Sequence, residues 1–261
     1  DIRSTVVYDD ETDAYYFTSK GGTFYSVQVT GDRKLTNKWS VNLANGVGGV
    51  PMSTSTPVVY GGRAYLGVSG AGQFSPYSGH NITVVDLSTF SIAYSVPTMG
   101  YPQTSGLLTT AYQNEDGYNY IYFIDNFTPG KLRVIRDMPG MTEVDPDYTT
   151  METYSKNGEE HTIETAYVLF TPDGAQAQYA ICSPIMDEYG TIYFKNDSGH
   201  LMAYGRMLEG MEIESQPTKT TYAPGEEFDA AGLTVVGDFG RGVKRNVTAY
   251  LIPPADAIQA G

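Results

Sequence analysis

The sequence contains a single cysteine, Cys182, among its 261 residues. One cysteine excludes an intrachain disulfide, which suits a reducing compartment and equally suits export from an anaerobic cell. Because Cys182 follows Ala180 and Ile181, we expect it to be a small core residue in an apolar strand. Long hydrophobic runs are absent too. No apolar stretch reaches the roughly 18 residues that a membrane-spanning helix needs, so we expect no insertion into a membrane.

Basic residues are also scarce. The chain has 16 Lys and Arg against 30 Asp and Glu, which gives a formal net charge of −14. Nucleic-acid phosphates and anionic membrane surfaces would repel such a chain, and no stripe of Lys and Arg offsets the repulsion. We therefore expect no nucleic-acid partner. The acidity favours solubility and would tolerate a divalent cation.

Patterns typical of amphipathic helices are rare, because apolar residues seldom recur at helical spacing for more than about ten residues. Turn-forming and aromatic residues are plentiful instead, with 29 Gly, 14 Pro, 22 Tyr and 10 Phe. Aromatic side chains suit pleated surfaces, and Gly and Pro separate short strands. The composition predicts an all-β protein.

A repeated unit organises the first 206 residues. Each copy has a short apolar strand, a polar turn, a strand ending in Tyr-Phe or a close variant, a Gly-containing turn and a further apolar strand. The four copies begin at Thr5, Thr56, Leu107 and Ser183. Candidate outer strands follow the first three copies at 38–41, 93–96 and 166–170. Four-stranded sheets of this kind can bury both faces only by stacking on one another.

The fourth copy carries a family resemblance. It reads Ser183-Pro184-Ile185-Met186, Asp187-Glu188-Tyr189-Gly190 and Gly199-His200-Leu201-Met202-Ala203. This resembles the repeat of quinoprotein-like (PQQ-type) β-propellers, and the resemblance covers about residues 1–206. It implies four four-stranded blades that form part of a larger propeller. The family's enzymes are rich in tryptophan, whereas this chain has only Trp39, so no quinone-binding residue is carried over.

The segment 207–261 reads differently. Its stretch from Pro217 to Val235 has the pattern P-T-K-x-x-Y-x-x-G-E-x-F-D-x-x-G-L-x-V. The pattern is similar to bacterial Ig-like domains of surface proteins. That resemblance implies a partial Ig-like β-sandwich, expected to be incomplete at its end, with Phe228 and Leu233 in its core. It also implies an extracellular or cell-surface location in a bacterium.

Two regions are candidate ligand sites. The loop after the second repeat's central strand holds Gln73, Phe74 and Tyr77, and exposed aromatics beside amides would suit a sugar or a peptide. The alternative is a flexible loop with one aromatic in the core. The first turn gathers Asp9, Asp10 and Asp13, which are weak calcium candidates. Ordinary hairpin chemistry explains those acids equally well.

Catalytic patterns are missing. His80, His161 and His200 have no partners at metal-site spacing, and no nucleophile motif occurs. The polar insertion at 137–165 suggests a lid or a surface hairpin. We predict a non-catalytic exported surface protein fragment that binds or scaffolds a glycan, a peptide, or a cell-wall or protein partner, without a cofactor other than a possible calcium ion. The alternatives are a quinone- or calcium-dependent propeller enzyme, such as a dehydrogenase, and a purely structural spacer.

Overall fold

The computed structural model describes residues 1–43, 52–70, 77–240 and 242–251. The chain forms two compact units. The first contains Asp1–Met186 and Ile192–Ala203, and the second contains Asp187–Thr191 and Tyr204–Gly261. Among the described residues, no helix has both the length and the apolar character required to cross a membrane.

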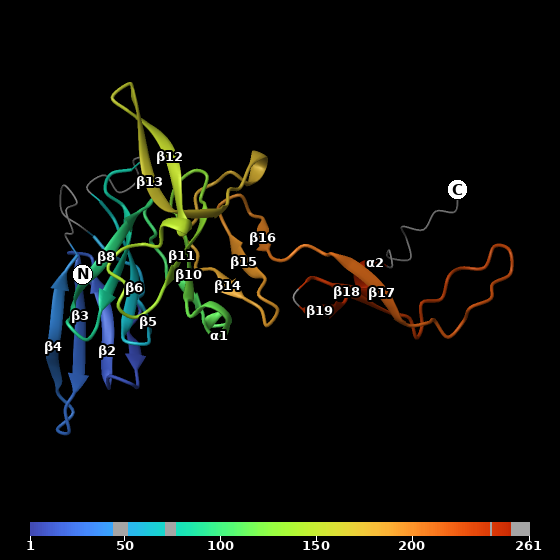
Figure 1. Cartoon of the computed structure of the whole chain (residues 1–261), viewed down its shortest axis with the longest axis horizontal. Helices are drawn as coiled ribbons and strands as arrows, with labels where there is room; N and C mark the ends of the chain where they lie inside the picture. Colours follow the sequence, from blue (N-terminus) through green and yellow to red (C-terminus); the bar gives the residue numbers. More distant parts are fainter. Residues whose placement is uncertain (44–51, 71–76, 241, 252–261) are drawn as a thin grey trace. The chain divides into compact units, whose positions relative to one another are not determined.

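The first two sheets are four-stranded antiparallel meanders, in which each strand pairs with the next along the chain (Figure 1). The first sheet contains β1 (Val7–Asp9), β2 (Ala14–Ser19), β3 (Thr23–Val29) and β4 (Leu35–Asn42). The second sheet contains β5 (Val58–Tyr60), β6 (Arg63–Val68), β7 (Asn81–Asp86) and β8 (Ser91–Pro97). These strands confirm the first two predicted repeats.

The third sheet has five strands in the order β12-β13-β11-β10-β9. They are β9 (Leu107–Thr109), β10 (Asn119–Ile124), β11 (Leu132–Asp137), β12 (Thr149–Lys156) and β13 (Glu159–Phe170), with α1 (Gln113–Asp116) and the 3-10 turn η1 (Pro146–Tyr148) between them. β12 and the first part of β13 form a hairpin, so the insertion at 137–165 contains a hairpin. The predicted turn at 114–117 is one turn of helix that ends at Gly117.

The fourth sheet corrects two expectations. It has three strands among the described residues, β14 (Ile185–Met186), β15 (Ile192–Lys195) and β16 (Leu201–Tyr204), after the 3-10 turn η2 (Gly174–Gln176). The fourth repeat therefore lacks a described outer strand. Cys182 lies outside any strand and is only partly buried, and its Sγ contacts the backbone oxygen of Lys195 at 2.6 Å. The apolar-core assignment of Cys182 was wrong.

The sheets of the first unit stack face to face. In β6, Ala64 and Leu66 face the first sheet and share a core with Tyr16 and Phe24. The intervening Tyr65 faces the opposite way and packs into a second core with the third sheet. This alternation follows from the two-residue period of a strand, and it buries both faces of the second sheet. Antiparallel meanders stacked in this way are β-propeller blades.

A buried ion pair joins the second sheet to the third. Arg63 in β6 donates from Nε and Nη2 to the two carboxylate oxygens of Asp137 in β11, at 3.0 and 2.9 Å. The hydroxyls of Tyr65 and Tyr94 donate to the same carboxylate, each at 2.8 Å. Asp137 is fully buried and has four donors. Removing Arg63 would leave the buried Asp137 carboxylate without its cationic partner.

The second unit has one described sheet, β17 (Gly210–Ser215), β18 (Thr234–Asp238) and β19 (Lys244–Asn246), followed by α2 (Thr248–Leu251). The hairpin predicted after Asp238 is confirmed, since β18 and β19 pair across it. Phe228 corrects the sequence analysis, because it is 52 % exposed and contacts the ring of Tyr222 rather than filling a core. It lies in a loop that runs from β17 to β18.

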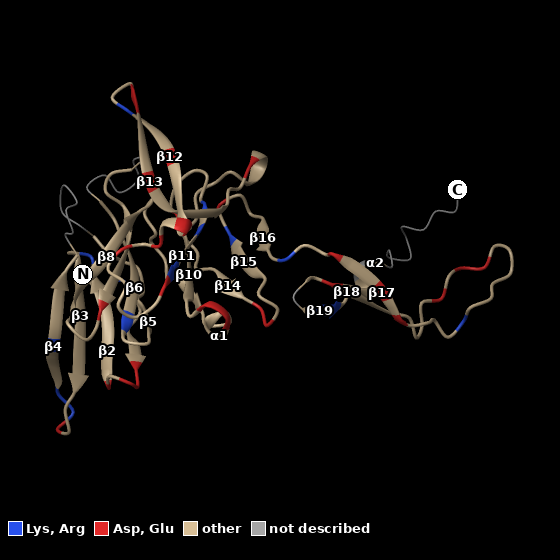
Figure 2. Ribbon diagram, viewed as in Figure 1, with Lys and Arg blue, Asp and Glu red and all other residues tan. Residues whose placement is uncertain are grey.

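Acidic side chains lie mostly on turns and loops, including the turn after β1 and the helix α1 (Figure 2). The few basic residues are dispersed, and several of them are buried partners of acids, as Arg63 and Arg133 are.

Candidate functional site

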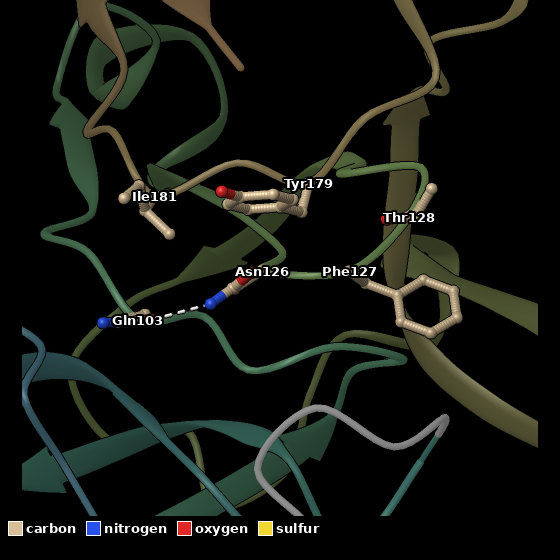
Figure 3. A pocket seen from close by; sticks show the side chains of 6 residues that line it. All are labelled: Gln103, Asn126, Phe127, Thr128, Tyr179 and Ile181. Atoms are coloured by element: carbon tan, nitrogen blue, oxygen red, sulfur yellow. Dashed lines mark hydrogen bonds between the residues drawn. The ribbon is translucent and has the colours of Figure 1, made fainter. Parts of the chain in front are cut away.

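A pocket of about 600 Å³ opens in the first unit (Figure 3). Three loops supply its lining: the β8–β9 connection, the β10–β11 hairpin loop and the β13–β14 connection. The lining residues are Gln103, Asn126, Phe127, Thr128, Tyr179 and Ile181. A volume in this range holds a small ligand or a short segment of a larger one.

The meander explains why these loops meet. Successive strands run in opposite directions, so alternate connections lie at the same end of a sheet. The connection that enters the third sheet, the loop between its second and third strands, and the connection that leaves it therefore share one end. The pocket forms where these three loops converge, and loops on a rigid sheet are common places for binding residues.

Backbone contacts fix the loops. The Asn126 amide donates to the Tyr101 carbonyl at 2.8 Å, and the Gly130 amide donates to the Gln178 carbonyl at 2.9 Å. Gly100 is required for the first of these approaches, because a Cβ there would lie 2.4 Å from Cβ of Phe127. Each loop is thus tied to its neighbour before any ligand binds.

The side chains divide the pocket into two kinds of surface. Asn126 Nδ2 donates to Gln103 Oε1 at 2.8 Å (Figure 3). That bond uses one donor and one acceptor, so the Gln103 amino group and the Asn126 carbonyl oxygen are available to a ligand. Tyr179 and Ile181, which are 39 % and 59 % exposed, supply an apolar wall.

Among the described lining residues, Tyr179 has the only ionisable side chain. The negative charge of Asp197 and a hydrogen bond to that residue raise the pKa of Tyr179 above its usual value. The phenol is therefore neutral at physiological pH and acts as a hydrogen-bonding group with a flat face.

A buried charge network supports the β10–β11 loop next to the pocket. Arg133 Nε lies 2.7 Å from Asp125 Oδ2, and Arg133 Nη2 lies 2.7 Å from Glu152 Oε2. Lys131 also pairs with Glu152. Asp125 immediately precedes Asn126, so the network holds the strand end that presents the Asn126 amide.

The pKa values of the two acids in this network shift in opposite directions. Burial raises the pKa of Asp125 to about 6, and the attraction of Arg133 only partly opposes it. Among the described atoms Asp125 Oδ1 has no hydrogen-bond partner, which is consistent with a poorly solvated carboxylate. Burial also raises the pKa of Glu152, but the positive charge of Arg133 and the hydrogen bond to Lys131 have the larger combined effect. The pKa of Glu152 is therefore lowered.

Only one residue of the predicted loop site is described by the structure. Gln73 and Phe74 fall outside the described residues. Tyr77 is half-buried, and its amide donates to the Met99 carbonyl at 3.0 Å. Its ring lies 5.5 Å from that of Tyr154, so Tyr77 contacts the β12–β13 hairpin. Tyr77 does not line the pocket, and its role in binding stays a prediction.

The acidic turn has internal hydrogen bonds. Asp9 Oδ2 accepts from the amide and the hydroxyl of Thr12. Asp13 accepts from the Tyr8 hydroxyl at 3.0 Å, and Asp10 is exposed. In the part of the chain that the structure describes, no three His, Cys, Asp or Glu side chains gather as metal ligands. Calcium binding at this turn stays a prediction.

Sequence reasoning missed the residues of the pocket. They come from three loops that are separated by more than 20 and by about 50 residues in the chain, and none of the loops carries a distinctive motif. One signal was present. The repeat register shows which connections share an end of the sheets, and those connections could have been searched for paired amides and aromatics.

Comparisons with known proteins give distant similarities in structure alone. No known protein family and no curated protein matches the chain. A quinohemoprotein alcohol dehydrogenase from Pseudomonas putida HK5 is similar over 77 % of this chain and 34 % of its own, with 13 % identity and a TM-score of 0.38. A europium-containing methanol dehydrogenase is similar over 79 % of this chain and 42 % of its own, with 12 % identity and a TM-score of 0.41.

BamB from Moraxella catarrhalis is similar over 90 % of this chain and 82 % of its own, with 12 % identity and a TM-score of 0.26. This chain spans about a third and about two fifths of the length of the two dehydrogenases. Similarities at this level say nothing about what the chain binds or whether it catalyses a reaction.

Proposed function

We propose that the chain is a non-catalytic binding module of an exported bacterial surface protein, and that its pocket takes a neutral glycan or peptide segment. One observation supports this proposal above the others. The pocket pairs two side-chain amides with an exposed aromatic and an aliphatic residue, and none of its described lining residues carries a carboxylate, imidazole, thiol or amine.

Those groups suit binding better than proton transfer. Side-chain amides donate and accept at once, which matches the hydroxyls of a sugar or the amides of a peptide. The ring of Tyr179 offers a flat apolar face. General acid–base chemistry needs a group that titrates near the working pH, and the raised pKa of Tyr179 moves it away from that range.

The second unit supports the surface-protein part of the proposal. Lys219 pairs with Glu226, and the Tyr222 hydroxyl contacts the Lys219 carbonyl at 2.9 Å and the Asp229 amide at 3.0 Å. The residues shared with bacterial Ig-like domains therefore contact one another within one loop. We propose that this unit is an Ig-like spacer, and that whole-cell labelling with an antibody against it would detect it at the cell surface.

Binding is tested by isothermal titration of the full chain with soluble peptidoglycan fragments, neutral oligosaccharides and short neutral peptides. Tyr179→Ala and Gln103→Ala should each weaken the binding of a ligand roughly tenfold or more, because each removes a direct contact. Tyr60→Ala is the matched control, since Tyr60 is 37 % exposed in the same unit but lies outside the pocket.

Two results would overturn the proposal. One is binding that Tyr179→Ala and Gln103→Ala leave unchanged. The other is dye-linked dehydrogenase activity after addition of pyrroloquinoline quinone and calcium, which would favour the enzyme alternative.

A further inference from the structure

The apolar wall of the pocket comes from one short segment of the β13–β14 connection. Tyr179 and Ile181 are exposed, whereas Ala180 between them is buried. Ala180 packs closely on the β10–β11 loop, because a Cβ on Gly130 would lie 2.9 Å from the Cβ of Ala180. The Tyr179 carbonyl also accepts from the Asp197 amide at 3.1 Å. Two neighbours therefore hold the segment whose exposed side chains line the pocket.

Tyr179 presents the face of its ring to a ligand. Its hydroxyl is hydrogen-bonded to Asp197, which is not among the lining residues. In Figure 3, Tyr179 and Ile181 lie on one side of the pocket, and the hydrogen-bonded pair of Asn126 and Gln103 lies on the other. An apolar ring face packs well on an aromatic side chain. The wall therefore suits a ligand that has a ring and a small apolar group.

The opposite side of the pocket offers one donor and one acceptor. The bond between Asn126 and Gln103 leaves the Gln103 amino group to donate and the Asn126 carbonyl oxygen to accept. Asn126 is 7 % exposed, so its side chain has little access to water, and a polar group in such a place gains from a hydrogen bond. A secondary amide has one carbonyl oxygen and one N–H, which match both groups at once.

We propose that the pocket binds an N-acetylated hexosamine unit of a glycan. This inference rests on the proposed function and narrows its ligand class. The acetamido group supplies the secondary amide to Gln103 and Asn126, its methyl group contacts Ile181, and the pyranose ring packs on Tyr179. An unsubstituted hexose has neither the amide nor the methyl group, and a linear peptide has the amide without the sugar ring. The unit is uncharged, as are the described lining residues.

The test is isothermal titration of the full chain with trisaccharides that share one backbone and differ in one substituent on each sugar. Chitotriose carries acetamido groups, cellotriose carries hydroxyls, and the deacetylated chitosan trimer carries amines. We expect chitotriose to bind roughly tenfold more tightly than either of the others, because each of them leaves an amide of the pocket without its partner. A blocked tripeptide of glycine and alanine is the remaining probe.

Two substitutions test the two sides of the pocket. Ile181→Ala should weaken the binding of chitotriose roughly threefold or more and leave cellotriose unchanged, because only chitotriose has a methyl group to place there. Ile185→Ala is the matched control, since Ile185 is 65 % exposed in the same unit and is not among the lining residues. Gln103→Glu replaces the amide donor by a carboxylate, so the chitosan trimer with its ammonium groups should then bind more tightly than chitotriose. Circular dichroism checks that each variant is folded.

The outcomes separate this inference from the proposed function. Equal affinity for chitotriose and cellotriose, with both weakened by Tyr179→Ala, would refute the N-acetyl assignment and keep the glycan-binding function. Binding of the blocked tripeptide alone would also refute it and would favour a peptide ligand. Absence of binding with every probe would overturn both this inference and the proposed function.

Discussion

Two six-residue strands of this protein lie at opposite extremes of burial. All six residues of β6 (Arg63–Val68) are buried, whereas all six residues of β17 (Gly210–Ser215) are exposed. β6 has a sheet packed on each of its faces, and β17 belongs to the single described sheet of the second unit. The comparison shows that strand content alone says little about stability. The first unit should owe its stability to contacts between sheets.

The largest expected effect comes from breaking the ion pair between the second and third sheets. Asp137→Ala removes the bidentate carboxylate partner of Arg63, which is 2 % exposed, and leaves it only the longer contact to Asp86 at 3.6 Å. We expect a loss of about 3–5 kcal/mol in the free energy of unfolding, because a buried charge loses its partner. Urea unfolding followed by fluorescence measures it, since Trp39, the only tryptophan, lies in β4 of the first unit.

The control for that prediction is an exposed ion pair in the same unit. Asp32 pairs with Lys34 at 2.7 Å, and both side chains are mostly exposed. Asp32→Ala should leave the unfolding midpoint unchanged, because solvent screens such pairs. An equal loss in the two variants would mean that the buried pair has no special role.

The next prediction compares a leucine buried between two sheets with an exposed leucine on the fourth sheet. Leu66 is fully buried between the first and second sheets, and Leu201 is 73 % exposed on the fourth. We expect Leu66→Ala to cost about 2–5 kcal/mol of unfolding free energy and Leu201→Ala less than about 0.5 kcal/mol. Urea unfolding of the two variants at the same low protein concentration measures both losses. Similar losses would contradict the idea that burial between sheets stabilises the unit.

Much of the first unit could be predicted from the sequence because strand patterns are local. The Tyr-Phe endings and the Gly turns locate β2, β10 and β15, and alternation fixes which side chains face inward. The hairpin after Asp238 was equally readable. What the sequence could not show was pairing over long distances. Arg63 and Asp137 are 74 residues apart, and no local pattern connects them.

The errors have a common physical cause. Cys182 and Phe228 have apolar character, and composition alone places such residues in a core. Whether a core exists at that point depends on what packs there, and Phe228 meets only Tyr222 among the aromatic contacts of its loop. The pocket was missed for the same reason, since Gln103, Asn126 and Tyr179 become neighbours only when the strands of the third sheet pair.

A pH measurement sharpens the view of the third sheet's interior. Burial raises the pKa of Asp125 to about 6, from an ordinary value of 3.8. The folded protein therefore binds a proton more tightly than the unfolded chain does. The contribution of Asp125 to stability is fully present below about pH 4 and is lost as the pH rises through 6.

Asp125→Asn removes that titration. The difference in unfolding free energy between the variant and the natural protein should shift by roughly 2–3 kcal/mol between pH 4 and 6.5, in the direction that penalises the natural protein at higher pH. Urea titrations at several pH values in this window give the change of this free-energy difference with pH. A difference that is flat, or that changes in the opposite direction, would show that the attraction of Arg133 outweighs burial.

The smallest effect is expected in the second unit. Phe228 is 52 % exposed, so Phe228→Ala should cost less than about 1 kcal/mol, whereas a phenylalanine in a packed sandwich core would cost about 3–5 kcal/mol. Val235 in β18 is 8 % exposed and is the internal reference, with a larger expected loss on truncation to Ala. Hydrogen exchange of the β17 and β18 amides reads the second unit separately from the first. Strong deprotection by Phe228→Ala would mean that this loop, and not the β17–β18 pairing, holds the unit together.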